Sequence, residues 1–171
     1  MVNETISHRG DLVRLLEKLK PGAFYESSYG GLGMGLGTAL GVKNAHPGRP
    51  VVLTIGDGSF YYNPVVAAFG ACQELELPLL VILFDNAGYQ SQKNDVVREY
   101  PQGWAVRANK FVGTSITPMP SYAILAHAFG GYGEKVERPQ GVRPALEHGL
   151  EAIKRGQLAL IHFVLEPVNR P

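Results

Sequence analysis

Two short polar motifs carry residue types that can hold a phosphate and a divalent cation together. The first, Gly56-Asp57-Gly58-Ser59, directly follows the apolar run Val51–Ile55. Its glycines let backbone N–H groups approach an anion closely, and its aspartate offers a carboxylate. The second, Asp85-Asn86-Ala87-Gly88-Tyr89, directly follows the apolar run Leu79–Phe84. Carboxylate, amide and carbonyl oxygens suit magnesium, so a Mg²⁺ site is expected if the two runs are neighbouring strands.

The apolar runs that precede these motifs predict buried strands. Each is nearly continuous rather than alternating, as is a third run at Leu158–Leu165, which is typical of a parallel sheet covered on both faces. Strands that alternate with helices indicate an α/β fold, here a three-layer, doubly wound and mostly parallel sheet. Ligands of such sheets bind at the carboxyl ends of the strands, where both motifs lie. The predicted helices are Asp11–Lys20, Pro64–Glu74, Tyr122–Phe129 and Pro144–Arg155.

Gly-Asp-Gly alone is also typical of a plain turn in which Asp57 caps a helix. The second motif at the end of the next strand weakens that interpretation. Asn63 is a predicted N-cap of the helix at Pro64–Glu74, whose positive end would then face the phosphate. The stretch Gly88–Ser121 shows no clear periodicity, and we expect part of it to cover the active site.

A glycine-rich block, Tyr29–Ala39, reads Tyr-Gly-Gly-Leu-Gly-Met-Gly-Leu-Gly-Thr-Ala. One interpretation is a helix N-terminus that packs tightly through its glycines. Another is a dinucleotide site, although the block lacks a strict Gly-x-Gly-x-x-Gly spacing and follows no clear strand. A phosphotransferase is a further alternative for a magnesium and phosphate site, but the sequence has no Gly-x-x-x-x-Gly-Lys-Ser/Thr loop.

Taken in order, the three blocks resemble the thiamine-diphosphate-dependent enzymes, in particular acetolactate synthase and benzoylformate decarboxylase. In that family Gly-Asp-Gly is followed by an asparagine pair, whose first member is replaced here by Asp85. The resemblance implies that Asp57, Asn86 and the Gly88 carbonyl bind Mg²⁺. It further implies that the Gly30 carbonyl accepts a hydrogen bond from the cofactor's 4′-amino group, and that Leu32 supports the bent cofactor.

The N-terminal segment Val2–His8 resembles the strand end and loop that contact the diphosphate in these enzymes. It implies roles for Ser7 and the Ile6 backbone, while a surface or helix-capping role is favoured for His8. Tyr89, Gln90 and Gln92 are expected near the substrate, with a solvated loop as the alternative. The predicted cofactor-binding residues are Ile6, Ser7, Gly30, Leu32, Gly56, Asp57, Gly58, Ser59, Asn86, Gly88 and Tyr89.

The resemblance implies a single diphosphate-binding, C-terminal type domain over residues 1–171, without the helix that would precede its first strand. The family's catalytic glutamate lies on a separate pyrimidine-binding domain, and neither Glu4 nor Glu26 matches its position. We therefore expect no catalytic residue in this chain. A larger partner chain carrying the pyrimidine-binding domain is expected, in a hetero- or homo-oligomer.

The resemblance implies a thiamine diphosphate- and Mg²⁺-binding subunit or fragment of a 2-oxo acid decarboxylase or carboligase. The alternative is a non-catalytic relative that binds the cofactor or only a partner. The net charge of +1 indicates no basic field for nucleic acid. The apolar run at Leu77–Phe84 is too short to cross a membrane. The single cysteine, Cys72, and the lack of a signal-peptide pattern favour a cytoplasmic location.

Overall fold

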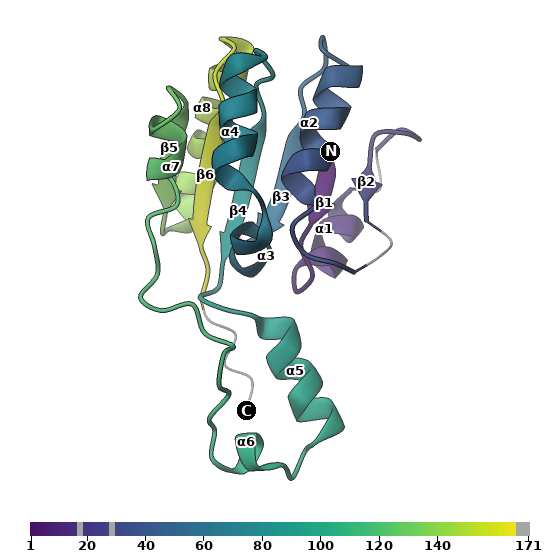
Figure 1. The fold of residues 1–171 in the computed structure, drawn as a ribbon, viewed down its shortest axis with the longest axis vertical. Coiled ribbons are helices and arrows are strands. Elements are labelled where there is room, and N and C mark those ends of the chain that lie inside the picture. The colour runs from purple at the N-terminus through teal and green to yellow at the C-terminus, as the bar shows by residue number, and fades with distance from the viewer. Residues whose placement is uncertain (17–18, 28–29, 167–171) are drawn as a thin grey trace.

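The computed structural model describes residues 1–16, 19–27 and 30–166 and contains one six-stranded sheet (Figure 1). The strand order is β2-β1-β3-β4-β6-β5, and every pairing of neighbouring strands is parallel. The strands are β1 (Val2–Glu4), β2 (Tyr25–Glu26), β3 (Val52–Gly56), β4 (Leu80–Asp85), β5 (Tyr132–Val136) and β6 (Ala159–Val164).

Apolar cores lie on both faces of this sheet, because successive side chains of a strand point to opposite faces. Val81 and Leu83 of β4 pack into one core, while Leu80 of the same strand packs into the other. The first core is covered by α2 (Gly35–Ala45), α4 (Val65–Glu74) and α7 (Ile124–His127). The second is covered by α8 (Val142–Lys154). The predicted three-layer, doubly wound fold is confirmed, with a sheet that is wholly parallel.

The three predicted strands are confirmed to within one residue at each end. The edge strands β2 and β5 were not predicted, since neither is a continuous apolar run: β5 reads Tyr-Gly-Glu-Lys-Val and only Val136 is buried. The predicted helix Asp11–Lys20 corresponds to α1 (Arg9–Leu15), and Glu17 and Lys18 lie outside the described residues. No helix in the described part of the chain is both long and apolar enough to span a membrane.

The prediction that Asn63 is the N-cap of the helix at Pro64–Glu74 was wrong by one residue, because Pro64 is the N-cap of α4. A separate helix, α3 (Asp57–Tyr62), begins directly at the end of β3. Pro64 keeps the residue before it out of the helical region, so Asn63 is extended and α4 begins only at Val65. The Asn63 side chain does not cap α4. The helix whose N-terminus faces the predicted phosphate site is therefore α3.

Residues 89–114 form an arm that extends away from the carboxyl edge of the sheet (Figure 1). It contains α5 (Gln90–Glu99) and α6 (Trp104–Arg107), although the sequence showed no periodicity there. Neither helix has a buried residue. The arm is closed at its base, where Tyr89 N donates to Thr114 O at 2.8 Å and Ile116 N donates to Ala87 O at 2.9 Å. The remaining short element is a 3₁₀ turn at Pro139–Gly141.

Candidate functional site

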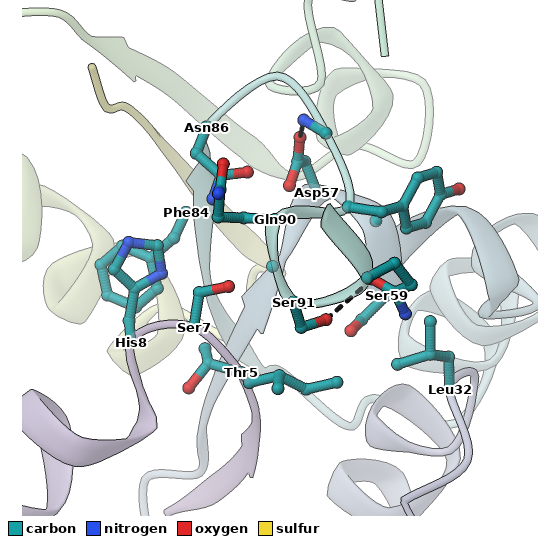
Figure 2. A pocket seen from close by; sticks show the side chains of 16 residues that line it. Thr5, Ser7, His8, Leu32, Asp57, Ser59, Phe84, Asn86, Gln90 and Ser91 are labelled. Carbon is teal, nitrogen blue, oxygen red and sulfur yellow. Dashed lines mark hydrogen bonds between the residues drawn. The ribbon is translucent and has the colours of Figure 1, made fainter. Parts of the chain in front are cut away.

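A hollow lies at the carboxyl ends of β1, β3 and β4 (Figure 2). The chain runs from β1 to β2 on one side and then returns to β3 on the other, so the strand order reverses between β1 and β3. Such a reversal opens a crevice in doubly wound folds. The hollow is partly open to solvent. Its lining comprises Thr5, Ile6, Ser7, His8, Leu32, Gly56, Asp57, Gly58, Ser59, Phe84, Asn86, Gly88, Tyr89, Gln90, Ser91 and Gln92.

Asp57 is the first residue of α3 and is only 2% exposed. Its Oδ2 accepts a hydrogen bond from Gly88 N at 2.8 Å. The Asn86 amide faces two acceptors, so its NH₂ group is the one oriented toward them. In this orientation Asn86 Nδ2 donates to Asp57 Oδ1 at 3.2 Å and to Gly88 O at 2.8 Å. Burial raises the pKa of Asp57 to about 7, and the nearby Asp85 adds to this shift. The expected convergence of Asp57 and Asn86 follows from the pairing of β3 with β4.

The turn after β4 has a constrained backbone that fixes Asn86 and Gly88. Ala87 has a positive φ of 60°, and its N–H donates to Asp85 Oδ1 at 2.9 Å. A Cβ on Gly88 would lie 2.2 Å from Thr114 O, so only glycine fits there. Asp85 Oδ2 pairs with His162 Nε2 of β6 at 2.8 Å, and both side chains are fully buried. Asp85, which departs from the asparagine of the family motif, thus supports the turn.

The glycine-rich block lies beside the hollow and is held by Glu4, at the end of β1. Glu4 is 9% exposed, and its Oε1 accepts from Gly33 N at 2.6 Å and Met34 N at 2.9 Å. Its Oε2 accepts from Gly35 N at 2.9 Å and from Asn63 Nδ2 at 2.7 Å. These N–H groups at the start of α2 are engaged within the protein. A dinucleotide phosphate would need them, so the structure argues against a dinucleotide site at this block.

Leu32 lines the main hollow, whereas Gly30 lines an adjoining one that shares Thr5, Ile6 and Leu32 with it. Gly30 has a φ of 60°, a conformation that glycine adopts readily. The first residue of the block, Tyr29, lies outside the described residues. The structure therefore places Gly30 next to the other predicted cofactor residues but in a neighbouring hollow.

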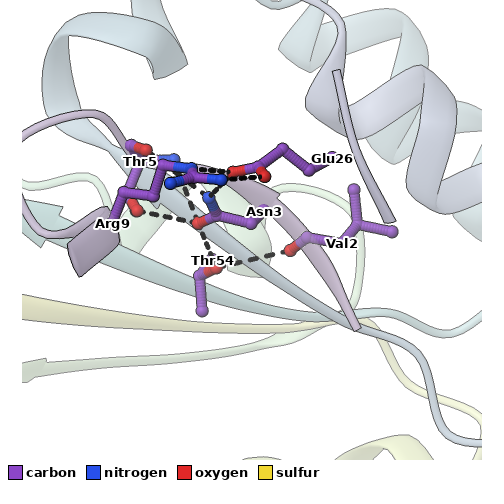
Figure 3. Close-up of polar contacts among 6 residues, drawn as sticks. All are labelled: Val2, Asn3, Thr5, Arg9, Glu26 and Thr54. Carbon is purple, nitrogen blue, oxygen red and sulfur yellow. Dashed lines mark hydrogen bonds and ion pairs between the residues drawn. The ribbon is translucent and has the colours of Figure 1, made fainter. Parts of the chain in front are cut away.

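A polar network holds the segment that follows β1 (Figure 3). Asn3 Oδ1 accepts from Thr5 N at 3.2 Å, from Thr5 Oγ1 at 2.7 Å and from Thr54 Oγ1 at 2.9 Å. Asn3 Nδ2 donates to Glu26 Oε1 at 3.1 Å, and Arg9 pairs with both carboxyl oxygens of Glu26 at 2.6 and 2.7 Å. The network joins β1, β2, β3 and α1, and it fixes the loop that carries Ile6 and Ser7.

His8 lies at the N-cap position of α1 but makes no capping hydrogen bond with its side chain. Its ring packs against Phe84, with 5.5 Å between the ring centroids, and it lines the hollow (Figure 2). Burial lowers the pKa of His8. His8 thus occupies a helix-capping position, although its side chain makes no capping hydrogen bond, and its partly exposed ring also forms part of the wall of the hollow.

All the predicted cofactor, metal and substrate residues except Gly30 line the main hollow, and their roles as ligands stay predictions. Sequence reasoning missed Thr5, Phe84 and Ser91, which are neighbours of predicted residues along the chain. It also missed the supporting roles of three buried residues, Glu4, Asn63 and His162, which act through contacts between distant parts of the chain. No local motif marks these three. In the described residues, no group of three or more His, Cys, Asp or Glu side chains could hold a metal ion.

Comparisons with known proteins identify relatives of this chain. The family described as "Thiamine pyrophosphate enzyme, C-terminal TPP binding domain" matches residues 7–163. The large subunit of acetolactate synthase isozyme 2 from Escherichia coli K12 is 35% identical over 129 residues, which cover 75% of this chain and 22% of that protein. A probable acetolactate synthase from Mycobacterium bovis is 30% identical over 155 residues, covering 90% of this chain and 26% of the relative.

Among solved structures, benzoylformate decarboxylase from Polynucleobacter necessarius is similar, with a TM-score of 0.78 and 25% identity. The match covers 99% of this chain and 30% of that one. The chain thus spans about a quarter of the length of the curated relatives it matches.

Proposed function

Because the chain belongs to the family of C-terminal, thiamine-pyrophosphate-binding domains of thiamine pyrophosphate enzymes, we propose that it binds thiamine diphosphate (the same compound) with Mg²⁺ for a 2-oxo acid decarboxylase or carboligase. The observation that carries this proposal is the hydrogen-bonded group of Asp57, Asn86 and Gly88 at the ends of two neighbouring strands.

These three residues fit a hard divalent cation. The Asn86 amide N–H groups link the two oxygens, Asp57 Oδ1 and Gly88 O, that would ligate the metal. A cation at this point would take the place of those N–H donors, and a rotated Asn86 amide would offer its oxygen instead. Carboxylate, amide and carbonyl oxygens, completed by phosphate and water oxygens, make the octahedral set that Mg²⁺ prefers.

The diphosphate would bind beside the metal, at the start of α3. The N–H groups of Gly58 and Ser59 lie at the helix N-terminus, where the backbone favours an anion. The Tyr89 ring lies so close to Gly58 that a Cβ there would meet it at 2.7 Å. Ser7 and the Ile6 backbone, which lie across the same hollow, would complete the diphosphate contacts.

The pyrimidine would lie toward the glycine-rich block, with the Gly30 carbonyl as acceptor and Leu32 under the bend. Bound thiamine diphosphate supplies a nucleophilic carbanion and an electron sink for breaking or forming a C–C bond. The residues of this chain bind and orient it. Tyr89, Gln90 and Gln92 follow the turn after β4 and line the same hollow, and they are proposed to face the 2-oxo acid.

We assign the glutamate that activates the cofactor to a larger partner chain with a pyrimidine-binding domain. Glu4 and Glu26 are the two acidic residues near Gly30, and both are engaged: Glu4 holds the start of α2 and Glu26 pairs with Arg9. The relatives named above are a synthase and a decarboxylase, which supports C–C chemistry of either direction.

The Asp57→Ala variant tests the metal site by isothermal titration with thiamine diphosphate, with and without Mg²⁺. We expect Mg²⁺-dependent binding to be lost, at least about a hundredfold weaker, because the buried carboxylate is the only charged side chain proposed as a ligand of the metal. Asp95→Ala, which removes an exposed carboxylate from α5, is the matched control and should bind like wild type. Unchanged binding by Asp57→Ala would overturn the proposed site. A wild-type chain that binds no cofactor would favour a partner-binding scaffold.

A further inference from the structure

The buried carboxyl group of Glu4 joins three segments that lie far apart in the sequence. Its two oxygens accept hydrogen bonds from the backbone N–H groups of Gly33, Met34 and Gly35 at the start of α2, as described above. Its fourth donor is Asn63 Nδ2, which comes from the end of α3. Asn63 in turn accepts from Leu36 N at 2.9 Å and donates to Ser59 O at 2.9 Å. Glu4 and Asn63 therefore tie the glycine-rich block to α3.

The glycines of the block let this junction close tightly. A Cβ on Gly33 would lie 2.5 Å from Tyr62 O, so the block rests directly on the backbone at the end of α3. A Cβ on Gly35 would lie 2.5 Å from Glu4 Oε2. Gly33 also has a φ of 99°, a backbone conformation that residues with a side chain rarely adopt. The glycine-rich block and α3 are thus in direct contact, and the side chains of Glu4 and Asn63 are buried beside this contact.

We propose that Glu4 and Asn63 are positioning residues that hold the pyrimidine half of the site at a fixed spacing from its diphosphate and metal half. This inference rests on the proposed function. The pyrimidine half contains Gly30 and Leu32, which immediately precede the N–H groups that Glu4 holds. The other half begins at Asp57, on the helix that Asn63 holds through Ser59 O.

A fixed spacing matters for a ligand that is gripped at both ends. Once one end is bound, the second contact forms within the same complex, and its gain in affinity depends on the second site being at the right distance. The affinity of a ligand that contacts only the diphosphate half does not depend on that distance. Loosening the junction should therefore weaken the binding of thiamine diphosphate and leave the binding of inorganic diphosphate nearly unchanged.

Two variants loosen the junction in different ways. Asn63→Ala removes the link to α3 and leaves Glu4 to hold the N–H groups of α2. Glu4→Gln places an amide NH₂ where one carboxyl oxygen now accepts from Gly35 N and Asn63 Nδ2, so donor faces donor. The matched control is Lys43→Met, which removes a buried side-chain amino group that donates to Pro47 O at 2.7 Å and Arg49 O at 3.0 Å, at the far end of α2 and outside the junction.

Isothermal titration with Mg²⁺ and either thiamine diphosphate or inorganic diphosphate measures both affinities, and thermal unfolding measures the fold of each variant. For Asn63→Ala we expect thiamine diphosphate to bind about tenfold more weakly or worse, and inorganic diphosphate within about threefold of wild type. Glu4→Gln should change the ratio of the two affinities in the same direction. Lys43→Met should leave that ratio unchanged even where it lowers the unfolding temperature.

If Asn63→Ala weakens both ligands equally, or neither, the positioning role is wrong while the proposed function stands. If wild type binds neither ligand, the proposed function fails and this inference falls with it. If Glu4→Gln does not fold, the ratio measured for Asn63→Ala decides the matter. Amide resonances of Gly33, Met34 and Gly35 give a readout without ligand: Asn63→Ala should shift them, since they share the Glu4 carboxyl group.

Discussion

The buried position of the Asp57 carboxyl group disfavours its ionised form when no cation is bound. It is 2% exposed, and burial together with the neighbouring Asp85 raises its pKa to about 7. The raised pKa means that the folded chain holds this proton more tightly than the unfolded chain does. The contribution of Asp57 to stability is therefore present at low pH and is lost as pH rises from about 4 to about 7. The proposed metal site therefore lowers the stability of the ligand-free protein at neutral and higher pH.

The variant Asp57→Asn should accordingly stabilise the ligand-free chain at about pH 8, by roughly 1–2 kcal/mol. The amide keeps an oxygen to accept from Gly88 N and removes the buried charge. Urea unfolding at about pH 8 and about pH 5 measures the effect, and the gain should shrink at the lower pH because wild-type Asp57 is then protonated. A gain that is the same at both pH values would show that charge is not its cause.

The arm at residues 89–114 is an element that the sheet does not need. Helices as short as α5 are marginal in isolation, and neither α5 nor α6 buries a residue that would stabilise it. Both ends of the arm meet at its base, through the hydrogen bond from Tyr89 N to Thr114 O. Only the beginning of α5 lines the hollow, with Gln90, Ser91 and Gln92. The expectation of an active-site cover therefore concerns this first turn, and the rest of the arm extends away from the sheet (Figure 1).

Replacing residues 90–113 by a short Gly-Ser turn should leave the free energy of unfolding within about 1 kcal/mol of wild type, because the ends already lie together. Binding of Mg²⁺ with inorganic diphosphate should also persist, since Asp57, Asn86 and Gly88 are retained. Urea unfolding and titration check the two parts. A matching replacement of α4, which buries Ala68, Phe69 and Cys72, should unfold the chain. Loss of cooperative unfolding on removing the arm alone would contradict this account.

At the scale of the whole molecule, the site gathers segments between Thr5 and Gln92 around one crevice. The crevice exists because the strand order reverses between β1 and β3. All groups proposed for diphosphate and metal lie in this chain, whereas the activating glutamate is assigned to a partner. Binding and turnover should therefore separate.

The isolated chain, given thiamine diphosphate, Mg²⁺ and a 2-oxo acid such as pyruvate or benzoylformate, should bind the cofactor but release no CO₂. Exchange of the cofactor's C2 proton for deuterium, followed by NMR, should stay at the rate of the free cofactor, because no carboxylic acid of this chain is proposed to face the pyrimidine ring. Addition of a larger chain with a pyrimidine-binding domain should raise both rates. Turnover by the isolated chain would refute the split of the site.

The sequence by itself determined the features that are local in the chain. Three nearly continuous apolar runs predicted β3, β4 and β6, because strands buried on both faces are apolar at most positions. The motifs at Gly56–Ser59 and Asp85–Tyr89 stood directly after two of these runs, so their place at the carboxyl edge followed. Edge strands such as β5, which contains Glu134 and Lys135 and buries only Val136, gave no comparable signal.

Only the tertiary structure decided which distant residues meet. Glu4 contacts Asn63 across 59 positions, and Asp85 contacts His162 across 77, and no spacing rule connects residues so far apart. The structure also assigned the roles of similar groups. The N–H groups of the glycine-rich block are held by a carboxyl group of the protein, so the proposed diphosphate site is left to α3. That assignment depends on the contacts of Glu4, at the end of β1, with the start of α2 and with Asn63, which the order of residues does not reveal.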